Sequence, residues 1–209
     1  MGGAKAIVAA VVLAICGTIA YSLIAEKQKR DQQRAVAALV VDTTAHLRKA
    51  LNGPPPADLV NRIDGNLKAV SAPRDPRLAG AAGLYIHGAR EIVRRRSDAE
   101  RLTREAAMSR RALNMHMAAA SRRDTYWIRV AADLKKRVER DHHDLDTSLK
   151  ILSQLLGTLP DAQKELAPHI DASQLLEDAE RRKAAARADE ALKRAAEDLE
   201  KVRRLAGPR

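Results

Sequence analysis

Uncharged apolar residues fill the start of the chain and form no run of similar length elsewhere. Residues 6–24, AIVAAVVLAICGTIAYSLI, contain no charged side chain. An α-helix rises about 1.5 Å per residue, so about 20 apolar residues cross the hydrocarbon layer of a bilayer, and this run reaches that length. The pattern predicts a transmembrane anchor over residues 1–25 that attaches the protein to a membrane.

Two other interpretations of this segment stay open. A signal peptidase could cleave after residues 20–22, AYS, and Cys16 follows residues that resemble a lipoprotein signal, although Ile15 fits that motif poorly. The apolar run is longer than the core of about 7 to 15 residues found in most signal peptides. We therefore expect the anchor to be retained.

Beyond the anchor, apolar residues recur at helical spacing between two proline-rich breaks. The spacing continues the first helix to about Leu51, where residues 52–56, NGPPP, end it. A short amphipathic helix follows, and residues 72–76, APRDP, break the chain again. We assign residues 26–78 to membrane-proximal helices with a proline-rich hinge.

Residues 79–157 contain no proline, and an apolar stripe with steps of three and four residues passes through them. Its unbroken phase favours one continuous helix of about 110 Å, and a helical hairpin that turns near residues 121–124 is the alternative. Gly157 followed by Pro160 predicts the end of this helix. The stripe is strongest just before that end, at His142, Leu145, Leu149, Leu152 and Leu156.

Residues 161–206 carry apolar positions in heptad spacing, which is typical of a coiled coil. They are Ala185, Ala188, Leu192, Ala195, Leu199 and Val202. Because each apolar stripe must be covered by another helix, the chain folds back on itself or pairs with a second copy. The predicted fold is all-α: an N-terminal transmembrane helix followed by long helices packed as an antiparallel bundle or coiled coil.

The composition limits the size of the side chains in the core and the classes of partner that the chain can bind. Aromatic residues make up 2% of the chain and phenylalanine is absent, so we do not expect a core built on large side chains. The net charge of +11 suggests nucleic acid or anionic lipid as a partner. No motif that reads a DNA groove accompanies the charge, so nucleic acid is the less favoured partner.

The basic excess is concentrated in one region of the predicted long helix. Four acidic residues, Glu91, Asp98, Glu100 and Glu105, are interleaved with it and can form ion pairs one helical turn away. A solvated surface is therefore the expected role, and binding of an anionic polymer is the alternative. The arginines stand at positions 90, 94, 95, 96, 101, 104, 110, 111, 122 and 123.

The one cluster with metal-ligand spacing is Glu139, His142, His143 and Asp146. Glu139 and His142 have the i, i+3 spacing that di-iron helical bundles use, and two i, i+4 pairs add possible chelates. A di-iron site needs a second such pair, which the chain lacks, so we expect His142 to be a polar residue within the apolar stripe instead. Met108, Met115, His116 and Met117 could bind Cu(I), but their helical spacing favours packing roles.

Residues typical of catalysis are missing from the sequence. It has no phosphate-binding loop, dinucleotide-binding glycine pattern, nucleophile elbow or zinc-type cysteine spacing, and its single cysteine lies in the apolar run. We predict no enzymatic activity, no cofactor and no resident metal. The alternatives are a helical metal-binding or metal-sensing module and a basic binder of nucleic acid or envelope polymer.

Charges around the anchor give conflicting indications of orientation. Lys27, Lys29, Arg30 and Arg34 follow it and favour a cytoplasmic body, whereas one apolar segment after a short tail is the usual arrangement for export. We expect a single-pass protein of a bacterial inner membrane with a periplasmic body, with the cytoplasm as the alternative. The predicted function is that of a helical scaffold or tether that contacts a protein partner or a second copy of itself.

Overall fold

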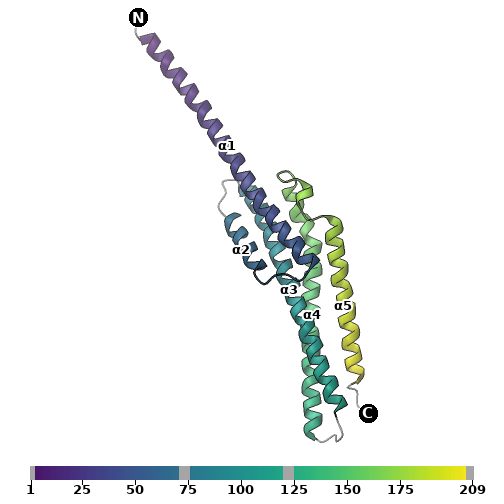
Figure 1. The fold of residues 1–209 in the computed structure, drawn as a ribbon. Helices are drawn as coiled ribbons and strands as arrows, with labels where there is room; N and C mark the ends of the chain where they lie inside the picture. The colour runs from purple at the N-terminus through teal and green to yellow at the C-terminus, as the bar shows by residue number, and fades with distance from the viewer. Residues whose placement is uncertain (1–2, 71–75, 120–124, 206–209) are drawn as a thin grey trace.

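The computed structural model describes the backbone of residues 3–70, 76–119 and 125–205, and the side chains of these residues except 3–17, 19, 20 and 205. Within these ranges the chain is all-α (Figure 1). The elements are α1 (Gly3–Asn52), α2 (Leu59–Val70), α3 (Pro76–Ala118), α4 (Thr125–Leu166), a 3-10 turn η1 (Ala172–Gln174) and α5 (Asp178–Leu205).

Helices α3, α4 and α5 lie side by side along an elongated bundle, and α1 joins them at one end and projects beyond it (Figure 1). Neighbouring helices in this bundle run in opposite directions, as residue pairs show: Ser148 contacts Arg95, and Trp127 contacts His116. Helix α2 covers α1 and α3 near the proline-rich break. The predicted packing of long helices is therefore confirmed.

Helix α1 ends where the sequence places its break. Val36, Val40, Leu47 and Leu51 are buried, and Gly53 donates its backbone N–H to the carbonyl of Lys49 as the helix terminates. Three prolines then prevent further helix because they lack N–H donors. Asp58 precedes α2 and accepts a hydrogen bond of 2.8 Å from Arg62 Nε, which lowers the pKa of the Asp58 carboxyl.

The part of the chain that the structure describes contains no helix with an apolar stretch long enough to cross a membrane. The predicted anchor, residues 6–24, lies mostly outside the residues whose side chains are described. Its backbone is helical from Gly3 onward. The transmembrane assignment therefore stays a prediction.

Residues 79–157 contain two helices packed against each other, which corresponds to the hairpin alternative and not to the continuous helix that the apolar phase favours. Helix α3 ends at Ala118 and α4 begins at Thr125. At this end of the hairpin the rings of His116 and Trp127 stack with centroids 4.9 Å apart, and Trp127 Nε1 donates to the His116 carbonyl at 3.3 Å. Helices α3 and α4 place their apolar stripes against each other.

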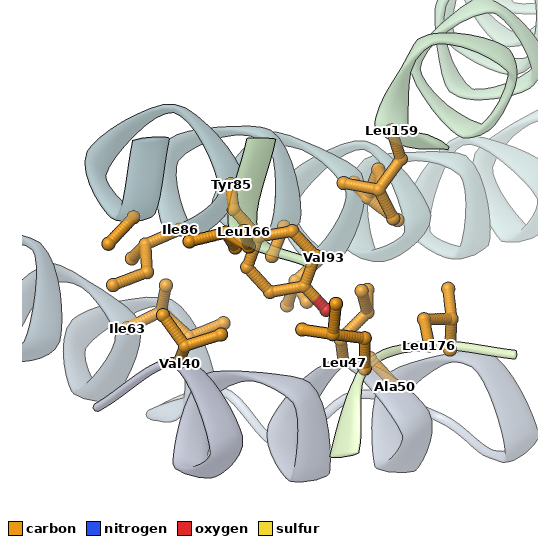
Figure 2. Packing of buried hydrophobic residues seen from close by; sticks show 14 of the residues in the cluster. Val40, Leu47, Ala50, Ile63, Tyr85, Ile86, Val93, Leu159, Leu166 and Leu176 are labelled. Atoms are coloured by element: carbon orange, nitrogen blue, oxygen red, sulfur yellow. The ribbon is translucent and has the colours of Figure 1, made fainter. Parts of the chain in front are cut away.

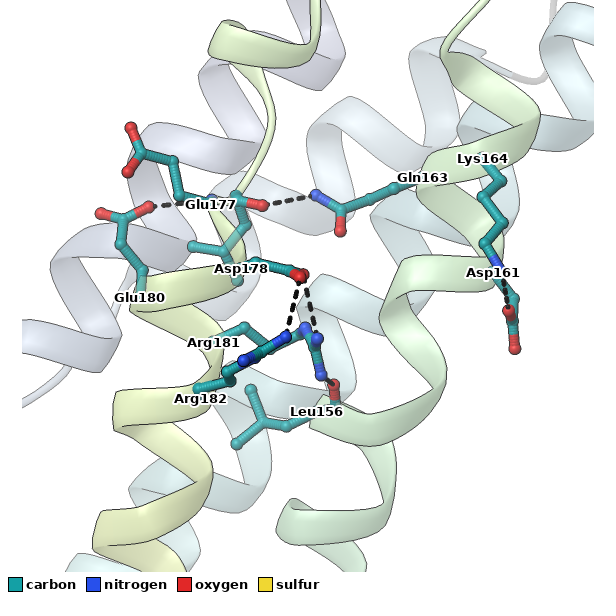
Figure 3. Close-up of polar contacts among 10 residues, drawn as sticks. Leu156, Asp161, Gln163, Lys164, Glu177, Asp178, Glu180, Arg181 and Arg182 are labelled. Atoms are coloured by element: carbon teal, nitrogen blue, oxygen red, sulfur yellow. Dashed lines mark hydrogen bonds and ion pairs between the residues drawn. The ribbon is translucent and has the colours of Figure 1, made fainter.

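Helix α4 also continues past the predicted stop at Gly157 and Pro160, to Leu166. A proline cannot donate to the carbonyl four residues earlier, which here belongs to Leu156. Arg181 of α5 donates to that carbonyl instead, at 3.4 Å (Figure 3). A contact between helices thus partly compensates for the missing hydrogen bond, and the chain reverses direction between Leu166 and Asp178, beyond the predicted helix end.

The start of α5 is fixed by polar contacts with α1 and α4, and Figure 3 shows those with α4. Glu180 Oε2 accepts from the backbone N–H of Glu177 at 3.1 Å and from Arg48 Nε at 2.9 Å. Gln163 donates to the carbonyl of Leu176 at 2.8 Å. These bonds satisfy backbone groups that a helix end leaves without partners and attach three helices to one another.

The main core lies at the end of the bundle that α1 joins (Figure 2). Aliphatic side chains from α1 to α4 pack there around Tyr85, which is fully buried. The Tyr85 hydroxyl lies 2.8 Å from Thr44 Oγ1, which is buried and 2.9 Å from the Val40 carbonyl. The core is thus built on branched aliphatic residues and one tyrosine, which agrees with the low aromatic content.

Candidate functional site

The four predicted metal ligands lie on α4 and do not converge. His142 is buried, with Nδ1 2.9 Å from the Val138 carbonyl, whereas His143 is exposed. Asp146 forms an ion pair of 2.7 Å with Lys150. Among the described residues no three His, Cys, Asp or Glu side chains form a group that could hold a metal ion. The metal-binding alternative therefore stays a prediction without support from the geometry.

The methionines of the second candidate also point to different places. Met108 and Met115 are exposed, and Met117 packs against the small apolar cluster of Leu113, Val138 and Val202. His116 is engaged with Trp127 through the ring stack and through Nε2, which lies 3.0 Å from the Trp127 carbonyl. These side chains do not form one ligand set.

Carboxylates neutralise much of the arginine-rich region of α3. Arg101 contacts Glu105 at 2.9 Å and Asp98 at 3.3 Å, and Arg90 contacts Glu91 at 2.6 Å and also Asp64 of α2. These hydrogen bonds raise the pKa values of Arg90 and Arg101. Arg122 and Arg123 lie outside the described residues. Exposed ion pairs of this kind contribute little to stability.

A groove of about 730 Å³ lies between α3 and α5. Its floor is α4, with His142, Leu145 and Leu149, and its walls combine five alanines with longer polar side chains. Because alanine side chains are short, α3 and α5 leave space between them above α4. We call this site the α3–α5 groove. Its alanines are Ala106, Ala107, Ala186, Ala191 and Ala195.

The α3–α5 groove begins where α1 ends. Arg187 of α5 donates to the carbonyl of Leu51 at 3.1 Å, one residue before the end of α1. Lys183 and Arg187 line the small pocket beside the end of α1 and also line the groove. Helix α1 therefore serves as a fourth helix at one end of the bundle, and the groove occupies the position that a longer α1 would fill.

The polar residues of the α3–α5 groove carry an excess of positive charge. Its lining has four cationic side chains and two carboxylates. Arg110 pairs with Asp198 across the groove, and Arg194 pairs with Glu190 at 3.1 Å. Lys183 and Arg187 take part in none of the ion pairs found among the described residues, which leaves two cations at the end nearest α1.

Sequence reasoning did not identify the α3–α5 groove, since its lining comes from three helices whose alignment only the folded hairpin fixes. The available signal was the enrichment of alanine on α3 and α5. Comparison with known proteins finds no matching family model, no similar characterised protein and no similar solved structure. The function must therefore be argued from the residues of this chain.

Proposed function

We propose that this protein is a membrane-anchored helical tether that binds one helix of a partner protein in the α3–α5 groove. The observation that carries the proposal is the missing fourth helix: α1 covers the bundle only as far as Asn52, and beyond it an alanine-lined groove stays open. Catalysis is not part of this function.

The anchoring part of the proposal is supported by the shape of α1. Its first buried side chain among the described ones is Val36, and the helix projects beyond the bundle toward the N-terminus (Figure 1). The uncharged residues 6–24 lie within this projecting part. A rod that carries an apolar segment at its free end is suited to hold a bundle at a membrane surface.

The dimensions of the α3–α5 groove favour a helix as the occupant. Its lining on α5 runs from Lys183 to Asp198, which is about 22 Å at about 1.5 Å per residue, or about four helical turns. Small side chains on both walls allow close approach of a helix about 10 Å wide. An amphipathic helix laid in an apolar groove is a common mode of protein recognition.

Charge specifies the partner helix further. Lys183 and Arg187 stand at one end of the groove without carboxylate partners in the described structure. A partner helix with a small apolar face and acidic residues at the edge that meets these two cations would complement them. Such charges at the rim of an interface mainly affect the association rate and its dependence on salt.

Site-specific photocrosslinking in cells tests the proposal. A photoreactive amino acid placed at Ala107 or Ala191, both in the groove, should crosslink to one partner protein, and the crosslinked peptide should be helical with acidic residues at one edge. The same label at Ala112 or Ala196, which lie on the same helices outside the groove, is the matched control. Equal crosslinking at all four positions contradicts the proposal, as do crosslinks that map only to a second copy of this chain.

We further propose that the protein is a single-pass protein of a bacterial inner membrane with its bundle in the periplasm. A reporter that is active only in the periplasm, fused after Arg209, should be active. If only the corresponding cytoplasmic reporter is active, the orientation is the reverse.

A further inference from the structure

The end of the bundle where α3 stops and α4 begins lies opposite the projecting part of α1 (Figure 1). Three large apolar side chains near this end are mostly exposed: Met115 (63%), Tyr126 (75%) and Ile128 (57%). Each stands within about 5 Å, along the helix axis, of the end of α3 or the start of α4. We call residues 111–118 of α3 and 125–129 of α4 the distal tip.

Two cations of the distal tip stand behind its apolar end. Arg111 lies one helical turn from Met115 on α3, and Arg129 lies one turn from Tyr126 on α4. Both arginines are exposed, and neither takes part in an ion pair found among the described residues. Arg111 and Met115 also line one open hollow of about 470 Å³ on α3. The distal tip therefore combines apolar side chains at its end with positive charge one turn behind them.

Carboxylates near the distal tip do not cancel this charge. Asp133 of α4 stands about 12 Å along the axis from the start of the helix at Thr125. Helix α5 packs beside Leu113 through Val202, and its acidic residues come earlier in the chain, farther from the tip. Over residues 106–138 the sequence has eight Lys or Arg residues against two Asp.

We propose that the distal tip binds the surface of an anionic lipid bilayer. Interfacial segments bury their apolar side chains about 5 to 10 Å into the boundary between headgroups and acyl chains, a depth that the apolar end of the tip matches. Tyrosine suits this boundary because its ring is apolar and its hydroxyl can stay hydrated. Arg111 and Arg129 then lie at the depth of the headgroups, where a guanidinium can donate two parallel hydrogen bonds to a phosphate.

The apolar end distinguishes a lipid surface from other anionic partners. A polyanion is held by cations and gains nothing from exposed aliphatic side chains, whereas a bilayer interface takes up both. Helix α3 has 43 residues and extends about 64 Å at about 1.5 Å per residue. If residues 6–24 span one membrane, which rests on the proposed anchor, the distal tip meets a second lipid surface and the protein tethers the two.

Fluorescence of Trp127 in the full chain tests this inference, because the sequence has one tryptophan and it lies between Tyr126 and Ile128. The chain is held in a non-ionic amphipol, which covers residues 6–24, and is mixed with vesicles whose acyl chains carry a nitroxide quencher. Vesicles of phosphatidylglycerol and phosphatidylcholine in equal parts should quench the fluorescence and sediment the chain. Vesicles of phosphatidylcholine alone should do neither.

The double variant Tyr126→Ser, Ile128→Ser tests the apolar contribution. It should weaken binding to the phosphatidylglycerol vesicles about tenfold, because two side chains no longer leave water. The matched control, Leu84→Ser, Met108→Ser, removes two exposed apolar side chains outside the distal tip and should bind as the unmodified chain does. Unchanged binding by the tip variant would leave charge alone as the cause, as for an anionic polymer, and overturns the inference.

The double variant Arg111→Gln, Arg129→Gln tests the charge and should weaken binding by about tenfold or more. Its matched control, Lys68→Gln, Lys193→Gln, removes the same charge from exposed positions outside the tip and should bind normally. Equal loss in both charge variants means attraction by net charge and overturns the inference.

Two other results also overturn the inference. One is equal quenching by both kinds of vesicle. The other is a dimer that Tyr126→Ser, Ile128→Ser abolishes in a chain that binds no vesicles, which would make a second copy the partner of the distal tip. The proposed anchor fails separately: a chain that stays soluble without amphipol contradicts the anchor, while binding by the tip is measured in the same way. Helix content by circular dichroism checks that each variant is folded.

Discussion

Gly157→Ala separates the observed course of α4 from the course that its glycine and proline predict. Gly157 is exposed in the interior of α4, and a methyl group added there would meet no atom within 4 Å. No described glycine has a positive φ. Alanine in a helix interior is more stable than glycine by about 0.5 to 1 kcal/mol, because glycine loses more backbone entropy on folding. The substitution should therefore raise the free energy of unfolding by that amount.

If the helix stops at residue 157, Gly157→Ala should instead lower the free energy of unfolding. Glycine would then adopt the left-handed conformation typical of a helix end, and alanine would cost about 1 to 2 kcal/mol there. For a protein of this size, about 1 kcal/mol shifts the melting temperature by about 2 to 4 °C. Thermal unfolding of the full chain in dodecylmaltoside, followed by circular dichroism at 222 nm, resolves such a shift.

Gly83→Ala calibrates the experiment. Gly83 lies inside α3, and an added methyl group there also meets no atom within 4 Å. Both substitutions should raise the melting temperature by similar amounts. A lower melting temperature for Gly157→Ala, together with a higher one for Gly83→Ala, would refute the continuation of α4 to Leu166.

Three further predictions concern the core and the start of α5. Thr44→Val removes the 2.8 Å partner of the buried Tyr85 hydroxyl and should lower the free energy of unfolding by about 1 to 3 kcal/mol in urea titrations, whereas Thr44→Ser should lower it much less. Burial raises the pKa of Tyr85 above its usual 10.0, so its contribution to stability is complete below pH 10 and is lost as the pH rises through the higher folded value. Tyr85→Phe should weaken this alkaline loss, and an unchanged alkaline profile would contradict the assignment. The hydrogen bond from Arg181 lowers the pKa of Asp178, so its stabilising effect is present above the usual value of 3.8 and disappears as the pH falls through the lower folded value. Asp178→Asn should reduce the loss of stability at acid pH, measured by thermal melts between pH 2 and 5, and equal acid sensitivity of both forms would show that this ion pair does not contribute.

The extent of the first two helices follows from the sequence because the signals that set it lie within a few residues of each helix. Residues 54–56 cannot donate backbone hydrogen bonds, so α1 ends at Asn52, close to the predicted Leu51. The position of α2 follows from a second local signal, because apolar residues recur every three or four positions over residues 60–70. Local chemistry decides both boundaries.

The hairpin and the continuation of α4 depend on contacts between distant residues. Helix α3 ends without a glycine or proline near its last residue, so no local signal marks the break between α3 and α4. Pro160 stays inside α4 while Arg181, 21 residues later, donates to the carbonyl that the proline leaves without its partner. Periodicity within one helix carries no information about such a donor.

The candidate site was hidden for a similar reason. The cluster at residues 139–146 is conspicuous in the sequence, but α4 directs His142 inward and His143 outward. The α3–α5 groove instead combines residues from 103–110 of α3 and from 183–198 of α5, five of which are alanines. These segments become neighbours only after the hairpin forms and α5 packs on α4. Small residues near one another in space, rather than reactive residues near one another in the chain, define the site.

Alkaline carbonate extraction of cell membranes, followed by mass spectrometry of the chain, tests the anchor most directly. We expect the chain to stay in the membrane pellet and peptides covering residues 6–24 to be recovered from it. A chain that carbonate releases into the supernatant, or one from which residues 6–24 have been removed, would contradict the account.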